Sequence, residues 1–196
     1  MPDNKGLEKE PQKNDRVYGF FRVATEDNGT VHRFDMDTGE EISLLDMDIN
    51  ARKDHFNRLF EIIKNRLPDG ISVSSWLGEI KLLDEKGDTI GELKYAQTSD
   101  SMKIRDMKSG IKGGGKLLLL QALIKQPETC RIYSSLVDDN GDAYRQARSE
   151  HNDELKALRN TPAYRNRAFC GFNGIVENES GGEIRPQLVS VPLPTS

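Results

Sequence analysis

The stretch KSGIKGGGKLLLLQALI, from Lys108 to Ile124, decides the fold, because a glycine triplet stands directly before a long apolar run. The residues before it, SMKIRDM, have the composition of a strand, and the apolar run predicts a helix that extends from Lys116 to Gln126 and ends at Pro127. A helix that is apolar nearly all round is expected to be enclosed by a sheet. The sequence therefore predicts a strand, a tight glycine turn and a buried helix, with Lys116 in the first helical turn.

The flanking sequence predicts a single α/β domain over residues 17–191, preceded by a disordered arm at 1–16 and followed by a flexible tail at 192–196. The arm is dense in charge and holds few apolar residues, so it cannot offset its ordering entropy by burial. Within the domain we expect a hairpin in 17–45, an amphipathic helix at 54–67, a second hairpin in 76–98, a strand at 130–137, helical structure in 138–165, a strand at 168–176 and an edge strand at 188–191.

Composition excludes several classes of protein. The net charge of -4 and sequence pI of about 5.5 argue against general nucleic-acid binding. The longest apolar run, Leu117 to Leu120, is too short to span a membrane, and the charged N-terminus does not resemble an export signal. The two cysteines, Cys130 and Cys170, are expected on strands as a buried, inert pair in a reducing compartment. We therefore expect a cytoplasmic protein, or one in the host cytoplasm if it is a secreted effector.

The glycine triplet is the strongest candidate for a binding site. Free backbone N–H groups at the start of a helix bind anions, and glycines allow a ligand to approach the backbone closely. Lys112 and Lys116 flank Gly113, Gly114 and Gly115, and both would add positive charge. The spacing matches neither a Walker A loop nor a dinucleotide-binding GxGxxG motif. The alternative is a flexible loop before a core helix.

The order of elements around this turn resembles the GCN5-related N-acetyltransferase (GNAT) family. In that family a hairpin and a long strand lead into a glycine turn that binds the pyrophosphate of coenzyme A at the start of an apolar helix. The resemblance covers roughly residues 76–172 and continues through Asn140, Ala143 and Tyr144 to the Gly-Phe pair at 171–172. It departs from the family where Gly110 replaces the usual Gln or Arg, and where residues 149–167 form an insertion.

The resemblance implies a central mixed, mostly antiparallel sheet flanked by helices, and an amine substrate, protein or small molecule, acetylated from acetyl-CoA. It makes Tyr144 the acid that protonates the departing thiolate, with Tyr164 as substitute if the insertion shifts the register. Asp100 and Glu92 are the candidate bases. The alternative for each is a solvated carboxylate on a strand, with no catalytic role. The residues expected to bind the cofactor are Met107, Lys108, Lys112, Gly113, Gly114, Gly115, Lys116 and Asn140.

Three functions remain open at this point. The chain is an acetyltransferase, a catalytically inactive protein of the same fold that binds a partner, or an unrelated α/β interaction module such as a bacterial or phage effector. A metal site is not expected, because His32, His55 and His151 are far apart and lack ligand-type partners at helical spacing. No serine elbow or Cys–His pair indicates nucleophilic catalysis.

Overall fold

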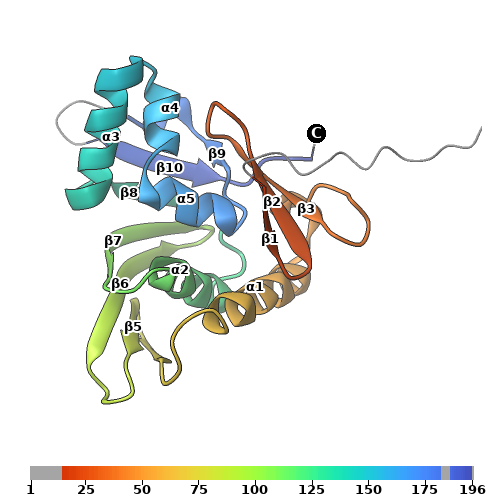
Figure 1. Cartoon of the computed structure of the whole chain (residues 1–196), viewed down its shortest axis with the longest axis vertical. Coiled ribbons are helices and arrows are strands. Elements are labelled where there is room, and N and C mark those ends of the chain that lie inside the picture. Colours follow the sequence, from red (N-terminus) through yellow and green to blue (C-terminus); the bar gives the residue numbers. More distant parts are fainter. Residues whose placement is uncertain (1–14, 182–185, 196) are drawn as a thin grey trace, which may run out of the picture.

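The structure, a computed structural model, describes residues 15–181 and 186–195. Most of the arm expected at 1–16 and the last residue of the expected C-terminal tail lie outside the described residues. The described chain is a mixed α/β fold with two sheets (Figure 1). Its strands are β1 (Arg16–Tyr18), β2 (Phe21–Thr25), β3 (Val31–Asp35), β4 (Ser72–Trp76), β5 (Glu79–Leu83), β6 (Thr89–Thr98), β7 (Ser101–Ser109), β8 (Arg131–Ser135), β9 (Gly174–Ile175) and β10 (Gln187–Val191).

The helices gather in two groups beside the large sheet. In Figure 1, α2 lies against β5, β6 and β7 and α1 packs against α2, while α3, α4 and α5 gather near β8 and β10. The helices are α1 (Ile49–Lys64), α2 (Gly114–Lys125), α3 (Asp138–His151), α4 (Glu154–Arg159) and α5 (Pro162–Phe169), with single 3₁₀ turns at η1 (Leu44–Asp46) and η2 (Glu177–Glu179).

The large sheet has the order β4-β5-β6-β7-β8-β10-β9 and is mostly antiparallel, as expected. Among the described strands, the one parallel pair is β7 with β8, because α2 connects these two strands and returns the chain to the end of the sheet where β7 began. The smaller sheet, β1-β2-β3, is antiparallel. It packs against α5, where Tyr18 and Phe21 contact the ring of Phe169.

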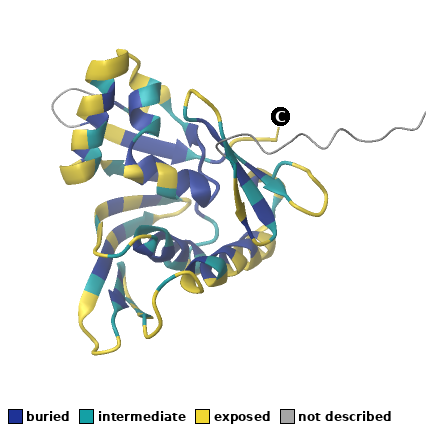
Figure 2. Cartoon of the chain, in the orientation of Figure 1, coloured by how far each residue is buried: buried dark blue, intermediate teal, exposed yellow. Residues whose placement is uncertain are grey.

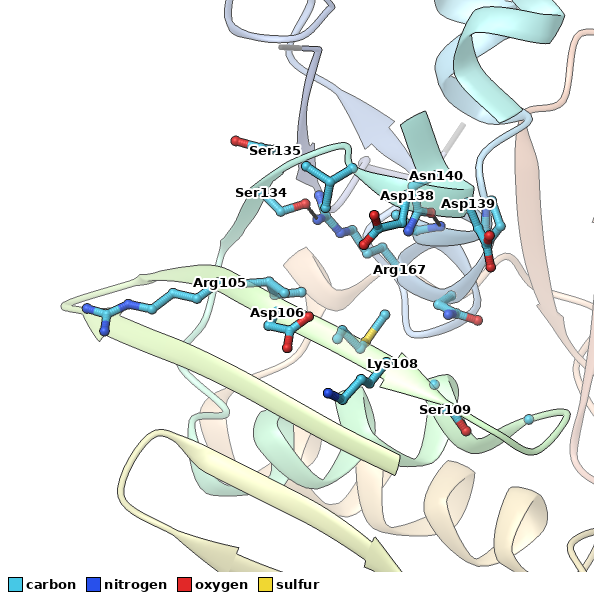
Figure 3. A pocket seen from close by; sticks show the side chains of 18 of the residues that line it. Arg105, Asp106, Lys108, Ser109, Ser134, Ser135, Asp138, Asp139, Asn140 and Arg167 are labelled. Atoms are coloured by element: carbon cyan, nitrogen blue, oxygen red, sulfur yellow. Dashed lines mark hydrogen bonds between the residues drawn. The ribbon is translucent and has the colours of Figure 1, made fainter. Parts of the chain in front are cut away.

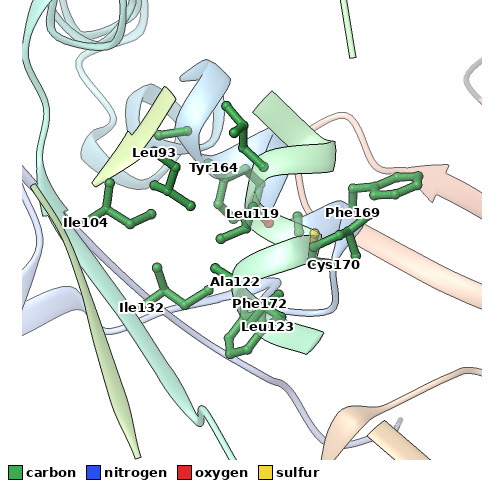
Figure 4. Packing of buried hydrophobic residues seen from close by; sticks show 14 of the residues in the cluster. Leu93, Ile104, Leu119, Ala122, Leu123, Ile132, Tyr164, Phe169, Cys170 and Phe172 are labelled. Atoms are coloured by element: carbon green, nitrogen blue, oxygen red, sulfur yellow. The ribbon is translucent and has the colours of Figure 1, made fainter. Parts of the chain in front are cut away.

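Helix α2 is the centre of the hydrophobic core. The side chains from Leu117 to Leu120 are fully buried, because α2 packs against α1, α5 and three strands of the large sheet at once. Figure 4 shows Leu119 and Leu123 of α2 packed with Ile132 of β8 and with Phe172. Figure 2 shows the consequence, since α2 is mostly buried while the outer side of α3 is exposed. The expected strand, glycine turn and enclosed helix are thus confirmed, with Lys116 in the first turn.

Helix α1 begins at Ile49, five residues before the expected start at Asp54. The carboxylate of Asp48 accepts a hydrogen bond from the Ala51 N–H at 2.8 Å, so this aspartate caps the helix. The apolar face that the sequence indicated is retained. Because Asp48 caps the helix, α1 has an extra first turn, and the few apolar residues of this turn did not indicate a helix in the sequence.

The strand expected at 168–176 is wrong. Thr161 caps α5 by accepting the Tyr164 N–H at 3.1 Å, and Pro162 occupies the first helical turn, so the helix continues to Phe169. Cys170 is therefore at the end of a helix, and only the two residues of β9 form a strand there. The strand expected at 188–191 is present as β10, but it lies between β8 and β9 and is not an edge strand.

The two cysteines also differ from the expected buried pair on strands. Cys130 is half-buried just before β8, with its Sγ atom 3.4 Å from Nη1 of Arg52. Cys170 is fully buried, and this burial raises the pKa of its thiol to about 12. At pH 8 the Cys170 thiol is therefore neutral as well as shielded from solvent.

We expect iodoacetamide at pH 8 to alkylate Cys130 in the folded protein and to spare Cys170, because the thiolate is the reactive species and must be accessible. Peptide mass mapping after timed exposure measures both sites. The unfolded protein serves as the control, in which both thiols should react at similar rates. Equal modification of the two cysteines in the native state would contradict this packing.

Candidate functional site

The candidate site is the space that opens where β7 and β8 part. The two strands pair over only three residues on each strand, and the last pair joins Lys103 to Tyr133. Beyond it, β7 keeps β6 as its neighbour on one side, and a pocket of about 580 Å³ opens on the other (Figure 3). The residues that line it are Ile104, Arg105, Asp106, Met107, Lys108, Ser109, Ile111, Gly113, Gly115, Ser134, Ser135, Val137, Asp138, Asp139, Asn140, Pro162, Ala163, Asn166 and Arg167.

A β-bulge in β7 lies next to the point of parting. Lys94 of β6 pairs with Asp106, but the next residue, Tyr95, pairs with Ile104, so Arg105 has no partner on β6. Bulges bend a strand and increase its twist, and they are common beside functional sites. In Figure 3 the Arg105 side chain extends away from the centre of the pocket. The bulge therefore turns β7 where its free edge begins.

The first turns of three helices line the same pocket. They belong to α2 with Gly113 and Gly115, to α3 with Asp138 and Asn140, and to α5 with Ala163. The Ala163 N–H is already bound to the side-chain oxygen of Asn140 at 2.6 Å. The Gly115 N–H, in contrast, has no acceptor among the described residues. The start of α2 is thus the end of the pocket best suited to an anion.

Each glycine of the triplet meets a different constraint. Gly113 has φ of 91°, a left-handed conformation that other residues adopt at a cost. A Cβ atom on Gly114 would lie 2.1 Å from Oγ of Ser109, which holds the turn by hydrogen bonds with Ile111. A Cβ atom on Gly115 would lie 2.8 Å from Nδ2 of Asn166, the far end of a side chain in the pocket wall. Gly113 and Gly114 therefore shape the turn, whereas Gly115 keeps the pocket wall open.

The lysines of the glycine turn are placed differently from one another. Lys108 lines the pocket, but Lys112 is exposed outside it. The Nζ atom of Lys116 lies 4.5 Å from the ring centre of Phe169 and 5.7 Å from that of Tyr18, so it points toward the small sheet. Of the residues expected to bind the cofactor, the structure brings together Met107, Lys108, Gly113, Gly115 and Asn140, and it leaves Lys112, Gly114 and Lys116 outside the pocket wall.

Neither expected base lines the pocket. The Glu92 carboxylate lies among three lysines, with Nζ of Lys94 at 3.1 Å and those of Lys81 and Lys108 at 3.9 Å. The hydrogen bond from Lys94 is the main cause that lowers the pKa of Glu92, so this group is a weak proton acceptor. Asp100 is exposed in the β6–β7 turn, where β7 begins and at the opposite end of that strand from the glycine turn.

The two candidate tyrosines also lie outside the pocket wall. The Tyr144 hydroxyl on α3 donates to Glu154 of α4 at 3.3 Å, and burial is the main cause that raises its pKa. The Tyr164 hydroxyl donates to the Asn173 carbonyl at 2.9 Å within the core, where burial also raises its pKa. Both hydroxyls are thus engaged with residues that do not belong to the pocket.

The pocket holds polar groups that the sequence analysis did not identify. Asp106, Asp138 and Asp139 are its carboxylates, and Arg167 is a buried cation beside Ser134. Burial lowers the pKa of Arg167 to about 9. One signal was available for the arginine, because Arg167 falls on the stripe formed by Ala163, Tyr164 and Ala168, where an apolar residue is expected. The aspartates carry no such signal, since their role depends on the parting of the strands.

Among residues 15–181 and 186–195, no group of three or more His, Cys, Asp or Glu side chains is arranged to hold a metal ion. No helix in these same ranges has the length and apolar character needed to cross a bilayer.

Comparison with known proteins does not assign the chain to a family. No protein-family model matches the sequence, and no curated protein matches it significantly. The function is therefore inferred from the residues and from the geometry of the pocket.

We expect Gly114→Ala to destabilise the protein by about 1–3 kcal/mol, because the added methyl group displaces Ser109 from a well-packed turn. Gly115→Ala should change the free energy of unfolding much less, since only the end of the Asn166 side chain must move. Urea unfolding followed by circular dichroism measures both variants. Equal destabilisation by the two substitutions would show that Gly115 is a structural residue and not part of an open wall.

Proposed function

We propose that this chain is an N-acyltransferase that binds an acyl-CoA thioester, with acetyl-CoA as the simplest donor, and acylates an amine on a protein or a small molecule. The observation that carries the proposal is the pocket that extends along β7 from the point where β7 and β8 part to the glycine start of α2. This arrangement suits a ligand with an anionic diphosphate at one end and an extended arm at the other. The resemblance to the GNAT family in the order of elements supports the same function.

The pocket residues fit such a ligand in three places. The unpaired N–H of Gly115 and the side chain of Lys108 suit the diphosphate. Residues 104–109 of β7 have a strand neighbour on one side only, so their backbone groups on the other side suit the amides of the pantetheine arm. This free edge spans about 17 Å of extended strand, a length similar to that of the extended arm. The thioester would then lie near the bulge at Arg105.

The chemistry divides between the ligand and the chain. Bound acyl-CoA supplies an activated thioester. The chain must accept a proton from the attacking amine, and Asp106, Asp138 and Asp139 are the carboxylates that line the pocket. Asp106 is the best placed of these, because it stands on β7 next to the bulge. The C–S bond of the thioester breaks as the C–N bond forms, and the departing CoA thiolate takes up a proton from solvent. The hydroxyl of Ser134 lines the pocket one residue beyond the last β7–β8 pair.

A second function is favoured by a different observation. The carboxylates and tyrosines expected to catalyse lie outside the pocket, while Trp76 and Leu77 are 76% and 90% exposed at the β4–β5 turn. Exposed aromatic and aliphatic side chains are typical of contact surfaces for partner proteins. The alternative is therefore an inactive protein that binds a partner, such as an effector. A location in the cytoplasm, or in a host cytoplasm, belongs to both proposals.

We expect acetyl-CoA and free CoA to raise the stability of the protein, because a ligand that binds only the folded state stabilises it by about 2.7 kcal/mol at a hundredfold excess over its dissociation constant. Thermal denaturation with millimolar ligand measures the shift, and ADP serves as a control that lacks the pantetheine arm. If CoA shifts the transition no more than ADP does, the acyl-CoA proposal is wrong and the interaction module becomes the better interpretation.

We expect Asp106→Asn to lower turnover by about 10²-fold, the scale of general base catalysis, while leaving CoA affinity within twofold. Turnover is measured as release of free thiol with the best amine found in a screen of peptides and polyamines. Asp142→Asn is the matched control, because Asp142 is exposed on α3, outside the pocket wall. Binding of CoA without acylation of any amine would favour the inactive protein.

A further inference from the structure

Arg167 is a buried cation in the pocket wall that has no acidic partner in the part of the chain that the structure describes. Its side chain on α5 is only 1% exposed, and no Asp or Glu of the described residues lies within ion-pair distance of it. Burial alone lowers its pKa, and no neighbouring charge offsets that effect. Burying an unpaired charge is costly, so such groups in proteins usually bind a counter-charge.

The hydrogen bonds of Arg167 orient the guanidinium but do not neutralise it. Nη1 donates to the carbonyl oxygens of Ile132 at 3.2 Å and Leu188 at 2.8 Å, and Nη2 donates to Oγ of Ser134 at 2.5 Å. The Nε atom is buried and has no acceptor. Because the Ser134 oxygen accepts a hydrogen bond from Arg167, its own proton remains available to a ligand. The pair thus presents donors and a positive charge without an anion.

This pair lies at the inner end of the pocket. Tyr133 is the last residue of β8 that pairs with β7, and Ser134 is the next residue along the strand. Figure 3 shows Arg167 beside Ser134, deep between the strands and α3. A ligand whose diphosphate binds at Gly115 and whose arm follows β7 would end here. The group that meets Arg167 is therefore the acyl group, and not the nucleotide.

We propose that Arg167 and Ser134 bind a carboxylate at the end of the acyl group, so that the preferred donor is the CoA thioester of a dicarboxylic acid, such as succinyl-CoA. This inference depends on the proposed function, because it assumes that an acyl-CoA occupies the pocket. The donors that remain include the second N–H of Arg167 Nη2 and the hydroxyl of Ser134, and a carboxylate can accept a hydrogen bond from each of them. The carboxylate of the bound donor also supplies a negative charge that balances the buried guanidinium of Arg167.

A second buried arginine shows why the location matters. Arg33 is also 1% exposed, and its Nη1 atom contacts Nε2 of His55 at 2.9 Å. It does not line the pocket, and burial lowers its pKa to about 10, an effect that the nearby Cys170 and Glu41 partly offset. Arg33 thus forms hydrogen bonds within the core, where the small sheet meets α1. Arg167 differs because it borders a pocket and has no acidic neighbour within residues 15–181 and 186–195.

The test is the selectivity of binding, measured by isothermal titration calorimetry with CoA, acetyl-CoA and succinyl-CoA. Wild-type protein should bind succinyl-CoA at least tenfold more tightly than acetyl-CoA, because hydrogen bonds between charged groups in a buried site are strong. Arg167→Met should reduce this ratio to within twofold. Ser134→Ala, a smaller change that removes one hydroxyl and keeps Arg167, should reduce it severalfold, so it carries the test if Arg167→Met does not fold.

Ser74→Ala is the matched control. Ser74 is also a serine on a strand, exposed on β4 and outside the pocket wall, so the selectivity ratio should not change. Equal affinities of wild type for acetyl-CoA and succinyl-CoA would overturn this inference and leave the proposed function standing. A preference for succinyl-CoA that survives in both Arg167→Met and Ser134→Ala would overturn the assignment to this pair. Failure of all three ligands to bind would instead reject the proposed function.

Discussion

The short parallel pairing of β7 with β8 is the constraint on which the site depends. The pairing stops after Lys103 and Tyr133, and the bulge at Arg105 begins two residues later. From there β8 follows its antiparallel neighbour β10, while β7 follows β6. The two halves of one sheet therefore diverge. Backbone groups that would normally pair across the sheet become the lining of a pocket.

The divergence is held by packing on both sides. On one side, α2 buries its leucines against β5, β6, β7 and α1. On the other, Arg167 of α5 reaches the backbone of both β8 and β10 through Ile132 and Leu188. Because α2 also contacts α5, the two halves are parts of one core. The pocket can therefore stay open without loosening the fold around it.

Charge is distributed unevenly along the pocket, and this favours one direction of binding. The unpaired N–H of Gly115 and the side chain of Lys108 make the α2 end attractive to anions. Asp138 and Asp139 make the start of α3 acidic, although it is also a helix N-terminus. Arg167 provides a second positive group at the inner end. A ligand with two separated anionic groups fits these charges better than one with a single anion.

The sequence by itself determined the elements whose signal is local. The apolar run after Gly115 fixed a buried helix, and alternating residues around the turn at 85–88 fixed a hairpin. Only the tertiary structure decided which side chains meet. Lys112 and Lys116 flank the glycines in sequence, yet neither lines the pocket, because the turn exposes one and directs the other to Phe169. Arg167 lines the same pocket as Gly115 although it lies more than fifty residues later in the sequence, because α5 packs on β8 and β10. Spacing along a chain predicts contacts within a helix or a hairpin, whereas a pocket is formed by the packing of distant elements.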